Sequence, residues 1–105
     1  MLLTTTEYLS GTDVQMIGLV KGSTIQTVNT FKDLGASLKT IVGGELKHYT
    51  QMMDDARRIA TDRMIFEAQS LGADAIIGVR YATSAVMQSA AEVMAYGTAV
   101  KIIRS

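Results

Sequence analysis

Cysteine and proline are absent from this sequence of 105 residues, and neither sign of charge is in excess. Without cysteine the chain cannot form disulfides, thiolate metal sites or iron–sulfur clusters, and it has no cysteine nucleophile. Ten basic and ten acidic side chains give a formal net charge of zero. A protein that binds nucleic acids or anionic membranes usually carries an excess of positive charge. This chain has none, so we expect neither as a partner.

Long apolar runs are missing as well. The longest stretch without a charged residue is 81–91, well short of the ~18 apolar residues of a membrane-spanning helix. Residues 1–3 show no basic region or cleavage signature of a secretory signal. Without proline or a Ser/Gly-rich linker, nothing marks an internal boundary. We therefore expect a single domain over 1–105, located in the cytoplasm.

Residue types predict strands at both ends of the chain and helices between them. In chain order, we predict strands over 2–6 and 14–24, a short helix over 30–42, a long helix over 45–71, and strands over 73–81 and 93–103. This is the order ββααββ. The first two strands can pair as a hairpin, and we expect the last two to do so. Gly72 ends the long helix, and Gly18 and Gly22 mark bends or close packing in the second strand.

The long helix has the clearest pattern. Its apolar residues follow one another at steps of three or four, as one buried face requires: Leu46, Tyr49, Met53, Ala56, Ala60, Met64, Ala68 and Leu71. On its polar side, opposite charges lie four residues apart in the pairs Asp54–Arg58, Arg58–Asp62 and Arg63–Glu67. We interpret this interleaving as a solvated face rather than a calcium or magnesium site.

Two features of the strands leave alternatives open. Residues 82–91 are small and weakly polar, so they either extend both flanking strands or form a loop. Segments 17–21 (IGLVK) and 77–80 (IGVR) resemble each other, but a match this short is weak evidence of an internal duplication.

The strands also lack the alternation of a sheet with one wet face. Apolar residues occupy both parities in 16–20, 75–79 and 93–96, so both faces of the sheet should be covered. The long helix can cover one face, but a short helix of about 12 residues spans only roughly 18 Å. A partner subunit is the simplest remaining cover, and we predict a homo-oligomer.

Several segments of the chain resemble the YbjQ family of small bacterial and archaeal proteins. They are 29–37 (NTFKDLGAS), 41–44 (IVGG), 71–79 (LGADAIIGV) and 97–100 (GTAV), together with the opening threonine run. The resemblance implies an α+β subunit of two layers, with a dodecin-like antiparallel sheet, assembled as a pentameric ring. It implies no known activity, although the family is commonly labelled "putative heavy-metal-binding".

Candidate metal ligands are few. Soft metals favour thiolate, thioether and imidazole ligands, and the sequence offers one histidine, His48, and seven methionines. No two methionines lie three or four residues apart, so we interpret them as core residues. A lone histidine is more often a solvated side chain than a ligand. A ring that gathers several copies of His48 would nevertheless hold a metal between subunits, and we keep this hypothesis.

Three cations lie in or beside apolar strands: Lys21, Arg80 and Lys101. Unpaired cations are rare in such positions. In one interpretation their stems pack while their heads reach solvent or an acidic partner such as Asp74 or Glu92. In the other, they line a pocket between subunits that binds a small anionic metabolite.

Motifs of catalysis are not found. The sequence has no Gly-x-Ser-x-Gly motif and no dinucleotide-binding motif. His48, the only histidine, cannot be matched to a nucleophile that it would activate. We therefore predict a non-enzymatic oligomeric module that binds a ligand or serves a structural role. A binder of a small anion at subunit interfaces is the second choice, and an enzyme with a shared active site is the third. The sequence does not indicate a cofactor.

Overall fold

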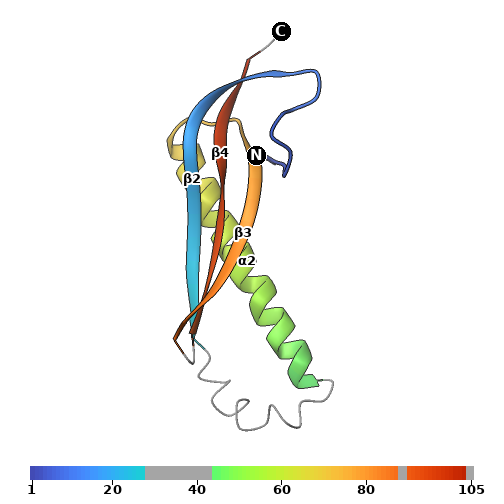
Figure 1. Cartoon of the computed structure of the whole chain (residues 1–105), viewed down its shortest axis with the longest axis vertical. Helices are drawn as coiled ribbons and strands as arrows, with labels where there is room; N and C mark the ends of the chain where they lie inside the picture. The colour runs from blue at the N-terminus through green and yellow to red at the C-terminus, as the bar shows by residue number, and fades with distance from the viewer. Residues whose placement is uncertain (28–43, 88–89, 104–105) are drawn as a thin grey trace.

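A computed structural model describes residues 1–27, 44–87 and 90–103. Its elements are β1 (Leu2–Leu3), β2 (Asp13–Thr27), α2 (Gly44–Ser70), β3 (Ala75–Met87) and β4 (Ala90–Ile103). The strands form one sheet, and α2 runs along one face of it (Figure 1). The expected α+β class is confirmed. The short helix expected over 30–42 lies outside the described residues, so the order ββααββ stays a prediction.

Strand pairing differs from the expectation at the N-terminus. The strand order is β1-β3-β4-β2, with β4 antiparallel to both β2 and β3. β1 pairs with β3, and the pairing is parallel. The prediction that the first two strands form a hairpin is therefore wrong, as is the expectation of a wholly antiparallel sheet. The reason is length: β2 pairs along its whole course with β4, whereas the short N-terminal segment fills the other edge, where Thr4 exchanges backbone hydrogen bonds of 3.0 Å with Ile76 and Val79.

The hairpin of β3 and β4 is confirmed and is longer than predicted. β3 continues to Met87 and β4 begins at Ala90. Of the two interpretations of 82–91, the extension of both strands is correct for the residues described there.

Helix α2 matches its predicted bounds to within one residue at each end. Ala56, Ala60, Met64 and Ala68 are fully buried, as their spacing of four predicts. They form one core with the inward side of the sheet, which includes Val20 and Val93. Leu71 was expected on the same buried face but is exposed. The helix has ended by then, and Gly72, with φ 78°, turns the chain away.

The close contact between α2 and β2 depends on Gly22. A Cβ atom at this position would lie 2.3 Å from both the Ala60 carbonyl oxygen and the Met64 backbone nitrogen. Backbone atoms cannot move aside as the end of a side chain can, so any larger residue would separate the helix from the strand. Of the two roles expected for Gly22, a bend or close packing, the structure shows close packing.

Two charged side chains of α2 reach the outer edge of β2. Arg63 and Glu67 were expected to pair with each other, but each binds the strand backbone instead. Arg63 Nη1 donates to the Ser23 carbonyl oxygen at 2.7 Å, and Glu67 Oε1 accepts from the Lys21 backbone N–H at 3.3 Å. Unpaired edge groups invite another strand to add to the sheet. The helix thus protects this part of the β2 edge.

Candidate functional site

The candidate site lies on the sheet face opposite α2, which we call the open face. Residues paired across antiparallel strands point to the same face, and Val20 and Val93 point towards the helix. The register then assigns the open face to Leu19, Lys21, Ser23 and Ile25 of β2, Arg80, Ala82 and Ser84 of β3, and Glu92, Met94, Tyr96 and Thr98 of β4. At one end of the sheet this side is closed by a small second cluster that includes Leu9, Ala75 and Val100.

Apolar side chains on the open face are exposed. Leu19 is 69% exposed and Ile25 is 56% exposed, and Tyr96 is also accessible. Along β2, the exposed Leu19 and Ile25 alternate with buried residues such as Val20 and Gly22. The strands therefore carry apolar groups towards both faces, as their lack of alternation predicted.

Two of the three predicted cations lie together on this face. Lys21 pairs with Tyr96, and Arg80 pairs with Tyr96 from the other side. The row Lys21–Tyr96–Arg80, which we call the central row, therefore crosses three adjacent strands. Tyr96 was not among the predicted site residues, because nothing in the sequence places it between the two cations.

A bulge in each of the two strands beside β4 sets this alignment. β2 has one extra residue between Met16 and Gly18, and β3 has one between Ile77 and Arg80, each relative to β4. Gly18 has φ 153° and Gly78 has φ 62°, backbone conformations that glycine adopts more readily than other residues. Without the extra residues, the positions opposite Tyr96 would be Val20 and Val79. With them, those two valines join the core and the cations face away from it. The resemblance between 17–21 and 77–80 is the sequence signal of this arrangement.

The Arg80 guanidinium is anchored at one nitrogen. Arg80 Nη1 donates to the carbonyl oxygens of Thr5 and Val79, both at 2.9 Å. In the described part of the chain, its other nitrogens form no hydrogen bond, and no carboxylate lies within 4.0 Å of Lys21 or Arg80. The two cations therefore share a row without a counter-charge from the described residues.

Neither acidic residue suggested as a partner compensates these charges. Asp74 Oδ2 accepts a hydrogen bond of 2.9 Å from the Ile102 backbone N–H, so it supports the other end of β4. Glu92 lies on the open face four residues from Tyr96, which corresponds to about 13 Å along a strand. Within a single chain, the structure therefore agrees with the interpretation that the charged ends of these side chains reach solvent. It does not agree with the interpretation that they pair with Asp74 or Glu92.

Lys101 does not belong to the central row. It pairs with Gln15 near the end of the sheet, and its Cε atom is 4.0 Å from the position of a Cβ on Gly72. It thus lies beside the C-terminus of α2, where the helix dipole favours a cation. The third predicted ligand-binding residue is therefore separate from the other two.

A metal site is not formed by the described residues. They contain no group of three or more His, Asp or Glu side chains placed to hold an ion, and the chain has no cysteine. His48 belongs to α2, but its side chain lies outside the described residues. The His, Asp and Glu side chains described for one subunit thus provide no group of ligands for a metal ion, and soft metals favour thiolate, thioether or imidazole ligands over carboxylates.

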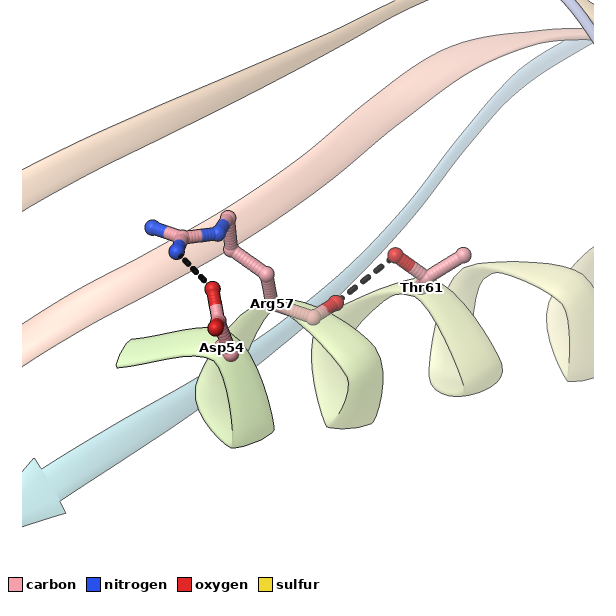
Figure 2. Close-up of polar contacts among 3 residues, drawn as sticks. All are labelled: Asp54, Arg57 and Thr61. Atoms are coloured by element: carbon pink, nitrogen blue, oxygen red, sulfur yellow. Dashed lines mark hydrogen bonds and ion pairs between the residues drawn. The ribbon is translucent and has the colours of Figure 1, made fainter. Parts of the chain in front are cut away.

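The carboxylates of α2 are used locally. Asp54 pairs with Arg57, whose carbonyl oxygen accepts a hydrogen bond of 2.7 Å from Thr61 Oγ1 (Figure 2). One turn further, Arg58 lies 3.8 Å from Asp62. All the ion-paired side chains are substantially exposed, so each pair contributes little to stability. This agrees with a solvated face rather than a site for a hard cation. Within the residues that the structure covers, no helix has the length and apolar character needed to cross a membrane.

Comparisons with known proteins give a consistent match. Residues 1–103 match the model of the YbjQ family, described as "Putative heavy-metal-binding". A UPF0145 protein of Clostridium novyi (strain NT) is 62% identical over 103 residues, covering 98% of this chain and all of that protein. A UPF0145 protein of Alkaliphilus metalliredigens (strain QYMF) is 55% identical over 103 residues, with the same coverage.

The fold resembles that of a solved structure. It is the crystal structure of a protein with unknown function of the DUF74 family from Pediococcus pentosaceus ATCC 25745, with a TM-score of 0.68 and 20% identity over 98% of each chain. At this identity the likeness concerns the fold alone.

Proposed function

Because this chain belongs to the YbjQ family, we propose that it is the subunit of a non-enzymatic, homo-oligomeric binding module. In this proposal residues 1–105 form a single domain with a dodecin-like arrangement. Copies assemble in the cytoplasm as a ring, which we expect to be a pentamer. A second copy covers the open face of each subunit.

The exposed apolar residues of the open face carry this proposal. Leu19, Ile25 and Tyr96 lie on a sheet face for which the described residues provide no helix. Fully burying a leucine or isoleucine side chain contributes about 1.5–3 kcal/mol. A 105-residue subunit gains much of its stability from such burial, because small domains bury a limited share of their own surface.

The mass of the assembly and one pair of variants test the proposal. Light scattering at micromolar concentration should give a multiple of the subunit mass. Leu19→Glu should lower that mass, because it buries a charge between copies. Phe66→Glu is the matched control: Phe66 is 73% exposed but lies on α2, away from the open face, and its substitution should leave the mass unchanged. A monomeric wild-type protein would contradict the proposal, as would equal effects of the two variants.

Heavy-metal binding enters the proposal from the family description alone. The His, Asp and Glu side chains described for one subunit form no such site, and the hypothesis of a metal held between subunits keeps His48 as its candidate ligand. Calorimetry with zinc and copper on tag-free protein tests this hypothesis, with His48→Ala as the control. Heat above that of the buffer, lost in the variant, would support a shared site, and its absence in the wild type would dispose of it.

The central row favours a second candidate function, the binding of a small anionic metabolite at the subunit interface. Lys21 and Arg80 supply two positive charges on the face that the proposed partner covers. This role and the covering of the open face are compatible, since one describes the assembly and the other what it holds.

A further inference from the structure

We infer that Lys21, Tyr96 and Arg80 form an oxyanion site, built by the two glycine bulges, which takes a small ligand carrying at least two negative charges. This inference rests on the proposed function in one respect: the second copy that covers the open face shields the site from water. It adds the residues, the device that positions them and the chemical class of the ligand.

The three side chains of the central row all present hydrogen-bond donors. An ammonium group, a phenol hydroxyl and a guanidinium follow one another across β2, β4 and β3. Neighbouring strands are about 5 Å apart, so the Cα atoms of Lys21 and Arg80 are separated by about 10 Å. Both side chains are long enough to reach the space above Tyr96, Arg80 after its Nη1 has released the Thr5 and Val79 carbonyl oxygens. A phosphate or carboxylate group held there would accept charge-assisted hydrogen bonds from both.

The Arg80 side chain is held on the β1 side of β3, the side away from Tyr96. Its Nη1 atom is fixed by the carbonyl oxygens of Thr5 and Val79, so the side chain is tied down at one nitrogen. The other guanidinium nitrogens make no hydrogen bond to the described residues and stay available. To bind a ligand above Tyr96, Arg80 Nη1 has to release these two carbonyl oxygens, whereas Lys21 forms no side-chain hydrogen bond with the described residues.

The bulges supply the second, independent observation. β2 has one extra residue, between Met16 and Gly18. β3 has one between Ile77 and Arg80 and a further register shift between Ala85 and Met87. A positive-φ glycine, Gly18 or Gly78, lies at or beside the first bulge of each strand. A single bulge would reverse the face of the residues beyond it in one strand only. The two together bring both cations opposite the same tyrosine. Bulges that redirect a side chain are common beside binding and active sites.

Charge balance identifies the ligand class. Covering two cations with a second copy removes water from them, and uncompensated charges at an interface are costly. No carboxylate of the described residues lies within ion-pair distance of either cation. A bound dianion would neutralise both charges, whereas a neutral ligand would leave the cost in place.

The test uses full-length protein, with inorganic pyrophosphate and citrate as separate probes. Calorimetry should show saturable binding of at least one probe, with sodium chloride at matched ionic strength as the reference. The probe that binds more tightly assigns the ligand as a phosphate or a carboxylate compound. Lys21→Gln and Arg80→Gln should each weaken binding at least tenfold, and Tyr96→Phe should weaken it less, because it removes only the hydroxyl.

Lys101→Gln is the matched control, since it removes the same charge from the same sheet but outside the central row. It should bind the probes as the wild type does. Far-UV circular dichroism checks that each variant is folded, and Arg80→Lys, which keeps the charge, should recover part of the affinity lost in Arg80→Gln.

The outcomes separate this inference from the proposed function. An oligomer that binds neither probe beyond the chloride reference would overturn the oxyanion site and leave the assembly standing. Equal loss of binding in Lys101→Gln would also overturn it, because a general charge effect would then explain the result. A monomeric wild-type protein would instead contradict the proposed covering of the open face, whatever the probes show.

Discussion

The two faces of the sheet are made from the same strands but differ in what they carry. Towards α2, small and apolar residues such as Val20, Val93 and Ala95 are almost free of solvent. Away from α2, Leu19 and Ile25 are exposed, and two cations lie among them. The first face is a core, fitted to one helix at close range. The second carries exposed apolar residues together with two charges that a core would exclude.

Removing a large side chain from the sheet–helix core should have the largest effect on stability. Met64→Ala empties a fully buried position between α2 and the sheet, and substitutions of this kind cost about 2–5 kcal/mol. Urea denaturation measures the loss. Phe66→Ala, two residues further along the same helix but 73% exposed, should change stability by less than about 0.5 kcal/mol. Similar losses in both would mean that the helix packs by another face.

Adding a side chain where the sheet packs against α2 should cause the next largest loss of stability. Gly22→Ala places a methyl group 2.3 Å from the backbone of α2, and overpacking costs about 1–3 kcal/mol. The loss of thermal stability should be clear by differential scanning calorimetry. Ser23→Ala, at the next position but on the open face, serves as the control. A neutral Gly22→Ala would show that the helix does not approach β2 so closely.

A change at the β3 bulge should affect the open face more than the core. Gly78→Ala is disfavoured at φ 62° by about 1–2 kcal/mol, and shifting the bulge should reduce the affinity for pyrophosphate or citrate by moving Arg80. Gly11 has a similar φ of 65° and open space around it, so Gly11→Ala should lose comparable stability and keep the affinity. Unchanged binding in folded Gly78→Ala would separate the bulge from the site.

The smallest effect concerns the edge of β2, where the two faces meet. Arg63→Ala removes a hydrogen bond to the Ser23 carbonyl oxygen, which contributes about 0.5–1.5 kcal/mol or more if charge-assisted. Its clearer consequence should be faster amide hydrogen exchange along β2, because the edge is less protected. Arg58→Ala, whose ion pairs are long and exposed, should leave that exchange unchanged. Equal exchange rates in the two variants would argue against edge protection.

Local patterns were enough to predict α2 and the hairpin of β3 and β4. The helix period is visible in the spacing of Ala56, Ala60, Met64 and Ala68, and hairpin strands are neighbours in sequence. The pairing of β1 was not predictable in this way. It depends on which edge of β3 is free after β4 and β2 have paired, and that is a property of the whole sheet.

The candidate site shows the same limit in more detail. Lys21, Arg80 and Lys101 look alike in sequence, as single cations in apolar strands. Which face each one occupies depends on parity along its strand, and one inserted residue reverses that parity. The bulges beside Gly18 and Gly78 therefore decide that two of the cations are paired with Tyr96 on the open face, while Lys101 lies beside the end of α2.

Side-chain footprinting of the native protein tests the central claim most directly, because it compares the two surfaces in one sample. Leu19 and Phe66 have nearly equal exposure in a single chain, 69% and 73%. If another copy lies on the open face, carbene or hydroxyl-radical labelling at micromolar concentration should modify Phe66 readily and leave Leu19 protected, after correction for the intrinsic reactivity of each residue type. Labelling of Leu19 to the extent that its exposure in one chain predicts would contradict the claim.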